Sequence, residues 1–319
     1  MFILFFLFLV LGTFSVKSDG GFIYPNLYFN YLSSQLDSPV LIMLINQILL
    51  ALGMVLVGYI VSNEEITEKQ NYLPVIIYFF IGSAGIYRNQ ISIFLLNNLF
   101  ILFAILKFLS TYRKDSALSE LFIACFWLSI SFYFNSGNIF IIPFIFIAMV
   151  IYRPFIWKEY LICMLGLIIP IYMYEMLAYT FEFNQWYFFE SLATLFNKFR
   201  QPVFKINFLP FLSSLILLFI MSIFYFIAQG LGNTVKKQKT KTTFFWMMLC
   251  LLPMIFTFGL SYSHILILYA VPVSFLIGEY LFEFNSKKLI NISCFVLLIT
   301  SLFYLLSKTN WLDNILPNF

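Results

Sequence analysis

The sequence predicts an all-α protein that spans a membrane several times, and three observations lead to that prediction. Of its 319 residues, 62% are hydrophobic and only 10% are charged, and the mean hydropathy is +0.94. A soluble domain of this size carries roughly a quarter of its residues as charges, so most of this surface must face lipid. The apolar residues also fall in runs of about 20 residues, the length that crosses a bilayer core as a helix.

The apolar runs are separated by polar or turn-forming residues, which divide the chain into about eleven spans. The approximate ranges are 2–16, 40–61, 72–87, 91–110, 118–134, 138–152, 159–180, 207–228, 244–262, 264–281 and 289–307. Polar turns at 88–90, 135–138 and 261–264 divide runs that are too long for one helix. Each turn therefore predicts a pair of antiparallel helices in a polytopic transmembrane bundle.

The first apolar run, residues 2–16, has two interpretations. It lacks a basic amino-terminal region, and no A-x-A cleavage signal lies near Ser15 to Gly20, so an uncleaved span is favoured over a signal peptide. On either interpretation the residues from 17 to 39 lie on the outer side of the membrane.

Lysine and arginine placement predicts the orientation, because basic loops stay in the cytoplasm. With the amino terminus inside, about twelve of the eighteen basic residues fall on inner loops. They are Lys69, Lys107, Arg113, Lys114, Arg153, Lys158, Lys236, Lys237, Lys239, Lys241, Lys287 and Lys288. The amino terminus is therefore predicted to be cytoplasmic, and the stretch 236–241 is interpreted as an orientation anchor in preference to a site for anionic lipid or a partner's acidic tail.

Charge and cysteine placement limit the partners and cofactors. The net charge of +4 follows from the orientation, and the chain has no nucleic-acid-binding module. Cys125, Cys163, Cys250 and Cys294 stand singly in apolar runs, so neither a disulfide framework nor a metal site is predicted. No phosphate-binding loop or G-x-S-x-G motif is present. Membrane lipids are the expected partners, and no cofactor is expected.

Two outer segments, 22–36 and 184–200, carry apolar residues at helical spacing with polar residues mainly on the other face. Helices of this kind lie in the headgroup plane with their apolar face toward the acyl chains. We therefore expect two interfacial helices on the outer side.

Polar residues inside the spans are the candidates for a functional site, because polar groups are costly in a bilayer. Asn46, Gln47, Asn97, Asn98 and Glu175 all fall about five or six residues from the outer end of a span, roughly 7 to 10 Å deep. Outer turns above them carry further polar residues, namely Asp19, Asp37, Arg88, Asn135, Ser136, Asn138 and His264. The hypothesis is a water-filled cavity that opens outward; the alternative is that the amides join helices by hydrogen bonds, and that His264 is structural.

The order of elements, with a large outer loop after the first span and another after the seventh, resembles the GT-C glycosyltransferases. The stretch from Asn97 to Glu175 is similar to the middle helices of that family. It begins within the motif LNNLFILF and includes the turn from Gly166 to Pro170. It is more similar still to an uncharacterised Bacteroidota family of multi-pass membrane proteins, and this resemblance implies the bacterial inner membrane as the location. The resemblance covers residues 1–230, which we take as one GT-C-like module, followed by a basic cytoplasmic loop and three spans in 231–319.

The resemblance implies transfer of a sugar from a polyprenyl-phosphate donor on the outer face. Asp19 would act as the general base, with Asp37 or Glu175 as further acidic residues, and Arg88 would hold the lipid phosphate. Two departures matter: Asp19 is followed by Gly20 rather than an acidic residue, and Arg88-Asn89-Gln90 replaces a second acidic position. The alternatives are therefore a catalytically inactive scaffold or lipid-binding component of an envelope complex, and a carrier for a lipid-linked intermediate.

The predicted orientation can be tested by labelling. Single cysteines at Gln238 and Ser286 are expected to react with a membrane-impermeant maleimide only from the cytoplasmic side, and one at Asn184 only from outside. Reaction of positions 238 and 184 from the same side would contradict both the span at 207–228 and the comparison with the GT-C enzymes.

Overall fold

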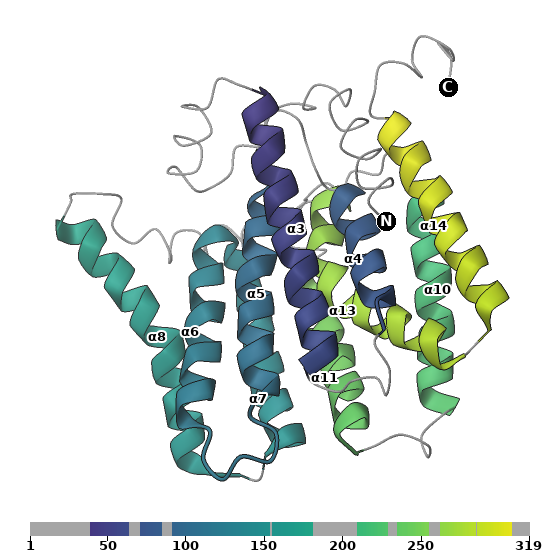
Figure 1. Ribbon diagram of the computed structural model, residues 1–319. Coiled ribbons are helices and arrows are strands. Elements are labelled where there is room, and N and C mark those ends of the chain that lie inside the picture. Colours follow the sequence, from purple (N-terminus) through teal and green to yellow (C-terminus); the bar gives the residue numbers. More distant parts are fainter. Residues whose placement is uncertain are drawn as a thin grey trace.

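The computed structural model describes residues 39–63, 71–84, 91–153, 155–180, 209–228, 235–254, 262–284 and 286–307 (Figure 1). These residues form ten α-helices and a 3-10 helix, with no strand among them, so the all-α class is confirmed for this part of the chain. The helices are α3 (Pro39–Asn63), α4 (Leu73–Ala84), α5 (Ile93–Leu109), α6 (Leu118–Phe134), η1 (Ser136–Ile141), α7 (Ile142–Tyr152), α8 (Trp157–Thr180), α10 (Leu209–Ala228), α11 (Val235–Leu251), α13 (Tyr262–Glu283) and α14 (Lys287–Ser307).

Five of these helices contain a stretch long and apolar enough to cross a membrane. The stretches are Val40–Ser62, Trp157–Leu177, Leu209–Phe226, Leu266–Glu283 and Lys287–Leu305. Four shorter apolar segments, Leu73–Ala84, Ile93–Leu109, Leu118–Phe134 and Gly137–Tyr152, lie beside them. The expected first span at 2–16 and the two expected interfacial helices at 22–36 and 184–200 lie outside the described residues.

The ninth expected span differs from the helix that the structure contains. We expected an apolar helix over 244–262 after a basic loop, but α11 begins at Val235 and its last helical residue is Leu251. The residues KKQKTK are therefore the first turns of α11, because lysine and glutamine are good helix formers despite their polarity. The helix ends before Pro253, whose ring restricts the preceding residue and which has no N–H to donate.

One helix lies at the centre of the bundle, and others lie at its edge. In α13, 83% of the membrane-length stretch is buried inside the protein, against 22% in α8 and α10. The exposed residues of α8 are mainly large and apolar, among them Leu161, Ile168, Met173 and Leu177. Figure 1 shows α8 at the margin of the bundle, where it packs mainly on α6. An apolar outer face of this kind is suited to acyl chains rather than water.

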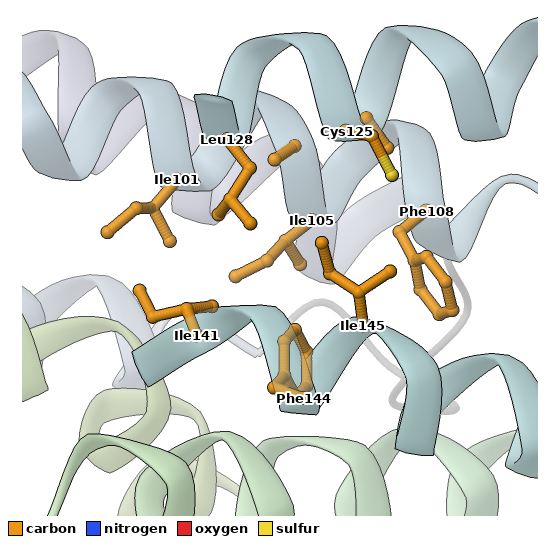
Figure 2. A pocket seen from close by; sticks show the side chains of 10 residues that line it. Ile101, Ile105, Phe108, Cys125, Leu128, Ile141, Phe144 and Ile145 are labelled. Carbon is orange, nitrogen blue, oxygen red and sulfur yellow. The ribbon is translucent and has the colours of Figure 1, made fainter. Parts of the chain in front are cut away.

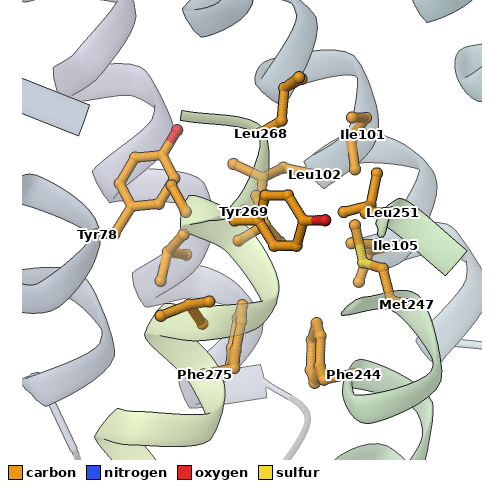
Figure 3. Close-up of a cluster of buried hydrophobic side chains, with 14 of the residues drawn as sticks. Tyr78, Ile101, Leu102, Ile105, Phe244, Met247, Leu251, Leu268, Tyr269 and Phe275 are labelled. Carbon is orange, nitrogen blue, oxygen red and sulfur yellow. The ribbon is translucent and has the colours of Figure 1, made fainter. Parts of the chain in front are cut away.

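Aromatic rings fill the space between α11 and α13. Phe244 and Phe275 stack with their centroids 4.3 Å apart and an interplanar angle of 10°. Figure 3 shows these rings facing each other, with Tyr269 extending toward Leu251. This contact holds α11 against the central helix.

Two glycines allow helices to approach closely, as small residues commonly do in membrane bundles. A methyl group on Gly166 of α8 would lie 2.8 Å from the carbonyl oxygen of Phe122 and 2.9 Å from Cβ of Cys125. A methyl group on Gly278 of α13 would lie 2.7 Å from the backbone nitrogen of Pro74. Neither position has room for a side chain.

A buried arginine joins two of the helix connections at one end of the bundle. Arg153 follows α7, is 7% exposed, and pairs with Glu159, which is 2% exposed; its Nε and Nη2 lie 2.7 Å from the two carboxylate oxygens. Arg153 also donates to the carbonyl oxygens of Thr111, at 2.9 Å, and Lys114, at 2.8 Å. The α5–α6 connection is therefore bound to the α7–α8 connection by a planar fork of donors.

Substitution of Gly166 tests the close packing of α8 on α6. Gly166→Ala is expected to destabilise the protein by about 1 to 3 kcal/mol, because a backbone carbonyl cannot move aside as a flexible side chain would. Gly58→Ala is the matched control, because a methyl group there would lie 3.5 Å from Val75 Cγ2, an ordinary contact. Thermal unfolding in detergent measures both; equal melting temperatures for the two variants would show that the packing is looser than described.

Candidate functional site

A layer of buried amide side chains is the most polar feature inside the apolar part of the bundle. Asn46 of α3, Asn97 and Asn98 of α5 and Asn138 of η1 are all completely buried. Gln47 of α3 is 7% exposed. A buried amide costs several kilocalories unless its hydrogen bonds are made within the protein, so the partners of these groups decide what the layer can do.

Asn138 is the centre of a hydrogen-bond network that joins α5, α6 and η1. Its Nδ2 donates to Oδ1 of Asn97, at 2.7 Å, and to the hydroxyl of Ser131, at 3.0 Å. Its Oδ1 accepts a hydrogen bond of 3.2 Å from Asn135. Asn97 was a predicted binding residue, and Asn135 and Asn138 belong to a turn that the sequence placed above the expected cavity, whereas Ser131 was not singled out. The network explains how the turn between α6 and η1 is held against α5.

Asn46 and Asn98 bind backbone groups of other helices. Oδ1 of Asn46 accepts a hydrogen bond of 2.7 Å from the backbone N–H of Ser92, one of the orphan donors at the start of α5. Nδ2 of Asn98 donates to the carbonyl oxygen of Ile267 in α13. These two bonds connect α3 to α5 and α5 to the central helix. Asn46, Asn97 and Asn98 therefore join helices, which is the structural alternative that the sequence left open.

The layer still contains polar atoms without a hydrogen-bond partner among the described residues. They are Oε1 of Gln47, Nδ2 of Asn97, Oδ1 of Asn98, and the hydroxyls of Tyr78, Ser92 and Tyr269. The Tyr78 hydroxyl lies near Asn98 but outside hydrogen-bond geometry, and it packs on Gly53 of α3. Uncharged donors and acceptors of this kind can bind a polar group, but they cannot act as an acid or base at neutral pH.

The other predicted site residues are not joined to this layer by any described contact. Glu175 is half-buried on α8 and follows Tyr174, whose ring lies 4.5 Å from that of Tyr133 in α6. Figure 1 shows the end of α8 that carries Glu175 leaning away from the bundle. Asp19, Asp37 and Arg88 lie outside the described residues. The backbone of His264 lies in the first turn of α13, and its side chain is outside the described part.

An apolar hollow lies between α5, α6 and α7, shown in Figure 2. Its lining is Ile101, Ala104, Ile105, Phe108, Ala124, Cys125, Leu128, Ile141, Phe144 and Ile145. The Cys125 thiol is the most polar group in this lining, so the hollow has nothing with which to orient a sugar or a phosphate. Among the described residues, no group of three or more His, Cys, Asp and Glu side chains could hold a metal ion.

A second cluster, of charged residues, lies where α11 begins and α13 ends. Lys237 and Lys241 of α11 face Glu279 and Glu283 of α13, and all four side chains are about nine-tenths buried. The shortest pair is Lys241 Nζ to Glu283 Oε1, at 2.5 Å. Two cations and two carboxylates balance each other, so this cluster has no net charge to offer a ligand.

Long apolar helices, lipid-compatible outer faces and buried polar layers are the features of an integral membrane protein. The chain belongs to the family of unknown function DUF6427, a model of which matches residues 33–312. No curated protein and no solved structure matches the chain.

Removal of the Asn138 side chain tests the amide network. Asn138→Ala is expected to lower the unfolding free energy by about 1 kcal/mol. The variant removes the N–H donor to Oδ1 of Asn97, and a hydrogen bond between membrane helices contributes a free energy of that order. Asn291→Ala on the exposed face of α14 is the matched control and should change little. Reversible unfolding in mixed micelles measures both variants, and indistinguishable values would contradict a structural role for the network.

Proposed function

We propose that this protein is a multi-pass protein of the bacterial inner membrane that binds a polyprenyl-phosphate lipid as a non-catalytic component of an envelope assembly. The proposal includes about eleven spans and a cytoplasmic amino terminus. The observation that carries it is the use of the buried amides: Asn46, Asn97 and Asn98 all bind other helices. Each of these amides holds a neighbouring helix with one of its two polar atoms, so it cannot turn to follow a sugar. A lipid phosphate requires only a cation at the membrane surface, for which Arg88 is the candidate.

A lipid-linked glycosyltransferase is the second candidate, and the helix arrangement favours it. The chain enters α3, leaves α8 and enters α10 at the same end of the bundle (Figure 1). In the sequence a long segment, 1–38, precedes α3 and another, 181–208, connects α8 to α10, and this order of elements resembles that of the GT-C enzymes. In that reaction Asp19 takes the proton of the acceptor hydroxyl as its oxygen attacks the anomeric carbon, and the bond to the lipid phosphate breaks with inversion. Arg88 holds the leaving phosphate, Glu175 orients the sugar, and Asp37 is a second acidic candidate.

Three variants distinguish the two candidates. Arg88→Ala is expected to weaken binding of a polyprenyl phosphate about tenfold, and Arg88→Lys by less, because a point charge replaces a bidentate fork. Asp19→Asn is expected to leave both lipid binding and complementation of a deletion strain unchanged, since a non-catalytic protein has no use for a base. Native mass spectrometry measures the binding, and Lys205→Ala, another basic residue of the outer segments, serves as the charge-matched control.

The results of these experiments distinguish the non-catalytic candidate from the glycosyltransferase. If Asp19→Asn abolishes complementation while lipid binding persists, the base is needed after binding, and the glycosyltransferase candidate replaces the non-catalytic one. Equal binding of polyprenyl phosphate by the wild type and both Arg88 variants would contradict the proposed lipid site at Arg88.

A further inference from the structure

Three cations converge on the ring of Tyr112, in the connection between α5 and α6. Cζ of Arg113 lies 5.3 Å from the ring centroid, Nζ of Lys236 lies 5.8 Å from it, and Nζ of Lys239 lies 5.9 Å from it. Two of the three come from α11, more than 120 positions away in the sequence. We call Tyr112, Arg113, Lys236 and Lys239 the basic cluster.

The helical form of KKQKTK separates its lysines into two groups with different surroundings. Lys237 and Lys241 are four apart, so they share a face, and this face meets Glu279 and Glu283. Lys236 and Lys239 are three apart and share another face, which meets Tyr112. The carboxylates of α13 neutralise the first pair.

The basic cluster is held in place by contacts that do not involve the cations. The hydroxyls of Tyr152 and Thr240 lie 2.7 Å apart, which attaches α11 to α7. The ring of Tyr152 meets that of Tyr112 edge to face, with the centroids 6.0 Å apart. Arg153 holds the α5–α6 connection through the carbonyl oxygens of Thr111 and Lys114. The cations therefore face a platform that is already ordered.

Arg113 occupies its place at a conformational cost. Its φ is +59°, the left-handed region that residues other than glycine rarely adopt. Like charges also repel, and lysines in the first turns of a helix oppose its dipole. Residues held in such a conformation cluster at ligand sites, where binding offsets the strain.

Most carboxylates at this end of the bundle are engaged with other cations. Glu159 pairs with Arg153, Glu120 pairs with Lys114, and Glu279 and Glu283 pair with Lys237 and Lys241. Within the described ranges, neither Arg113 nor Lys239 forms an ion pair with a carboxylate. Asp115 is the remaining described carboxylate near Tyr112, and Glu64, Glu65 and Glu68 lie outside the described residues.

We propose that Arg113, Lys236 and Lys239 bind the phosphate group of an anionic phospholipid, with the ring of Tyr112 as their platform. Lysine and arginine suit phosphate oxygens as point charges and as a fork respectively. A lipid fits better than a free phosphate, because apolar side chains are exposed close to the cations in the sequence: Val235, which begins α11, is 59% exposed, and Leu118, which begins α6, is 39% exposed. This site is independent of the outer polyprenyl-phosphate site proposed above, since it lies at the other end of the bundle.

The site is tested by native mass spectrometry of the full chain in a neutral detergent, with phosphatidylglycerol as the probe. The triple variant Arg113→Gln, Lys236→Gln, Lys239→Gln is expected to bind at least about tenfold more weakly, since each cation near a lipid surface contributes appreciably. The control replaces Lys158, Lys287 and Lys288 with glutamine; all three are exposed at the same end, so the net charge changes equally. The control should lose less than about threefold. Equal losses in the two triple variants would overturn the site in favour of diffuse attraction.

Two further measurements exclude misfolding and a free-phosphate site. Arg113→Gly removes the cation while relieving the positive φ, so it should weaken phosphatidylglycerol binding without lowering the melting temperature in lipid-free detergent. Retention of wild-type binding by Arg113→Gly would contradict the role of Arg113. Inorganic phosphate at equal concentration should leave the melting temperature unchanged, whereas phosphatidylglycerol should raise it. An equal rise with inorganic phosphate, or with phosphatidylcholine, would overturn the assignment to an anionic lipid.

Discussion

The constraint on which the structure depends is that the hydrocarbon core of a membrane offers no hydrogen-bond partners. Polar side chains of the spans therefore bond to the protein itself. Ser129 of α6 donates to the carbonyl oxygen of Leu167 in α8 at 2.6 Å, and Ser222 of α10 donates to that of Leu276 in α13 at 2.9 Å. Asn98 does the same to Ile267. Apolar area cannot select one helix neighbour over another in lipid, so these bonds and the glycine contacts specify the neighbours.

The same constraint explains why uncharged and charged polar groups occupy different levels. The amides of Asn97 and Asn138 lie within the bundle, where two neutral groups satisfy each other at modest cost. The buried ion pairs lie where helices end: Arg153 and Glu159 flank the α7–α8 connection, and Lys241 meets Glu283 in the last turn of α13. Desolvating an ion costs far more than desolvating an amide, so charges are best placed near the membrane surface and in pairs.

The sequence predicted the positions of most helices because bilayer thickness sets the length of an apolar run, and that length can be read without knowing any neighbour. It missed the start of α11, because hydropathy measures affinity for lipid and not the tendency to form a helix. It identified Asn46 and Asn98 as unusual, but their partners are backbone groups of Ser92 and Ile267. Backbone N–H and carbonyl groups occur in almost every residue, so no pattern of residue types shows which of them a side chain will bind. The Arg153–Glu159 pair was missed for a related reason: Arg153 was assigned to a basic loop, where arginine is ordinary, and Glu159 was counted as the first residue of the next span.

The lysines of the six residues from Lys236 to Lys241 have different surroundings once the stretch is helical. In the sequence, the four lysines were interpreted together, either as an orientation anchor or as a site for anions. On a helix they point in different directions, and the neighbours of each direction decide the outcome. Lys237 and Lys241 meet carboxylates and become part of a neutral buried cluster, so they cannot attract an anion. Lys236 and Lys239 meet an aromatic face beside Arg113, which adds charge of the same sign. A ring quadrupole attracts each cation only weakly, and Arg113 and Lys239 form no ion pair within the described ranges, so this face of the stretch is the part suited to an anion.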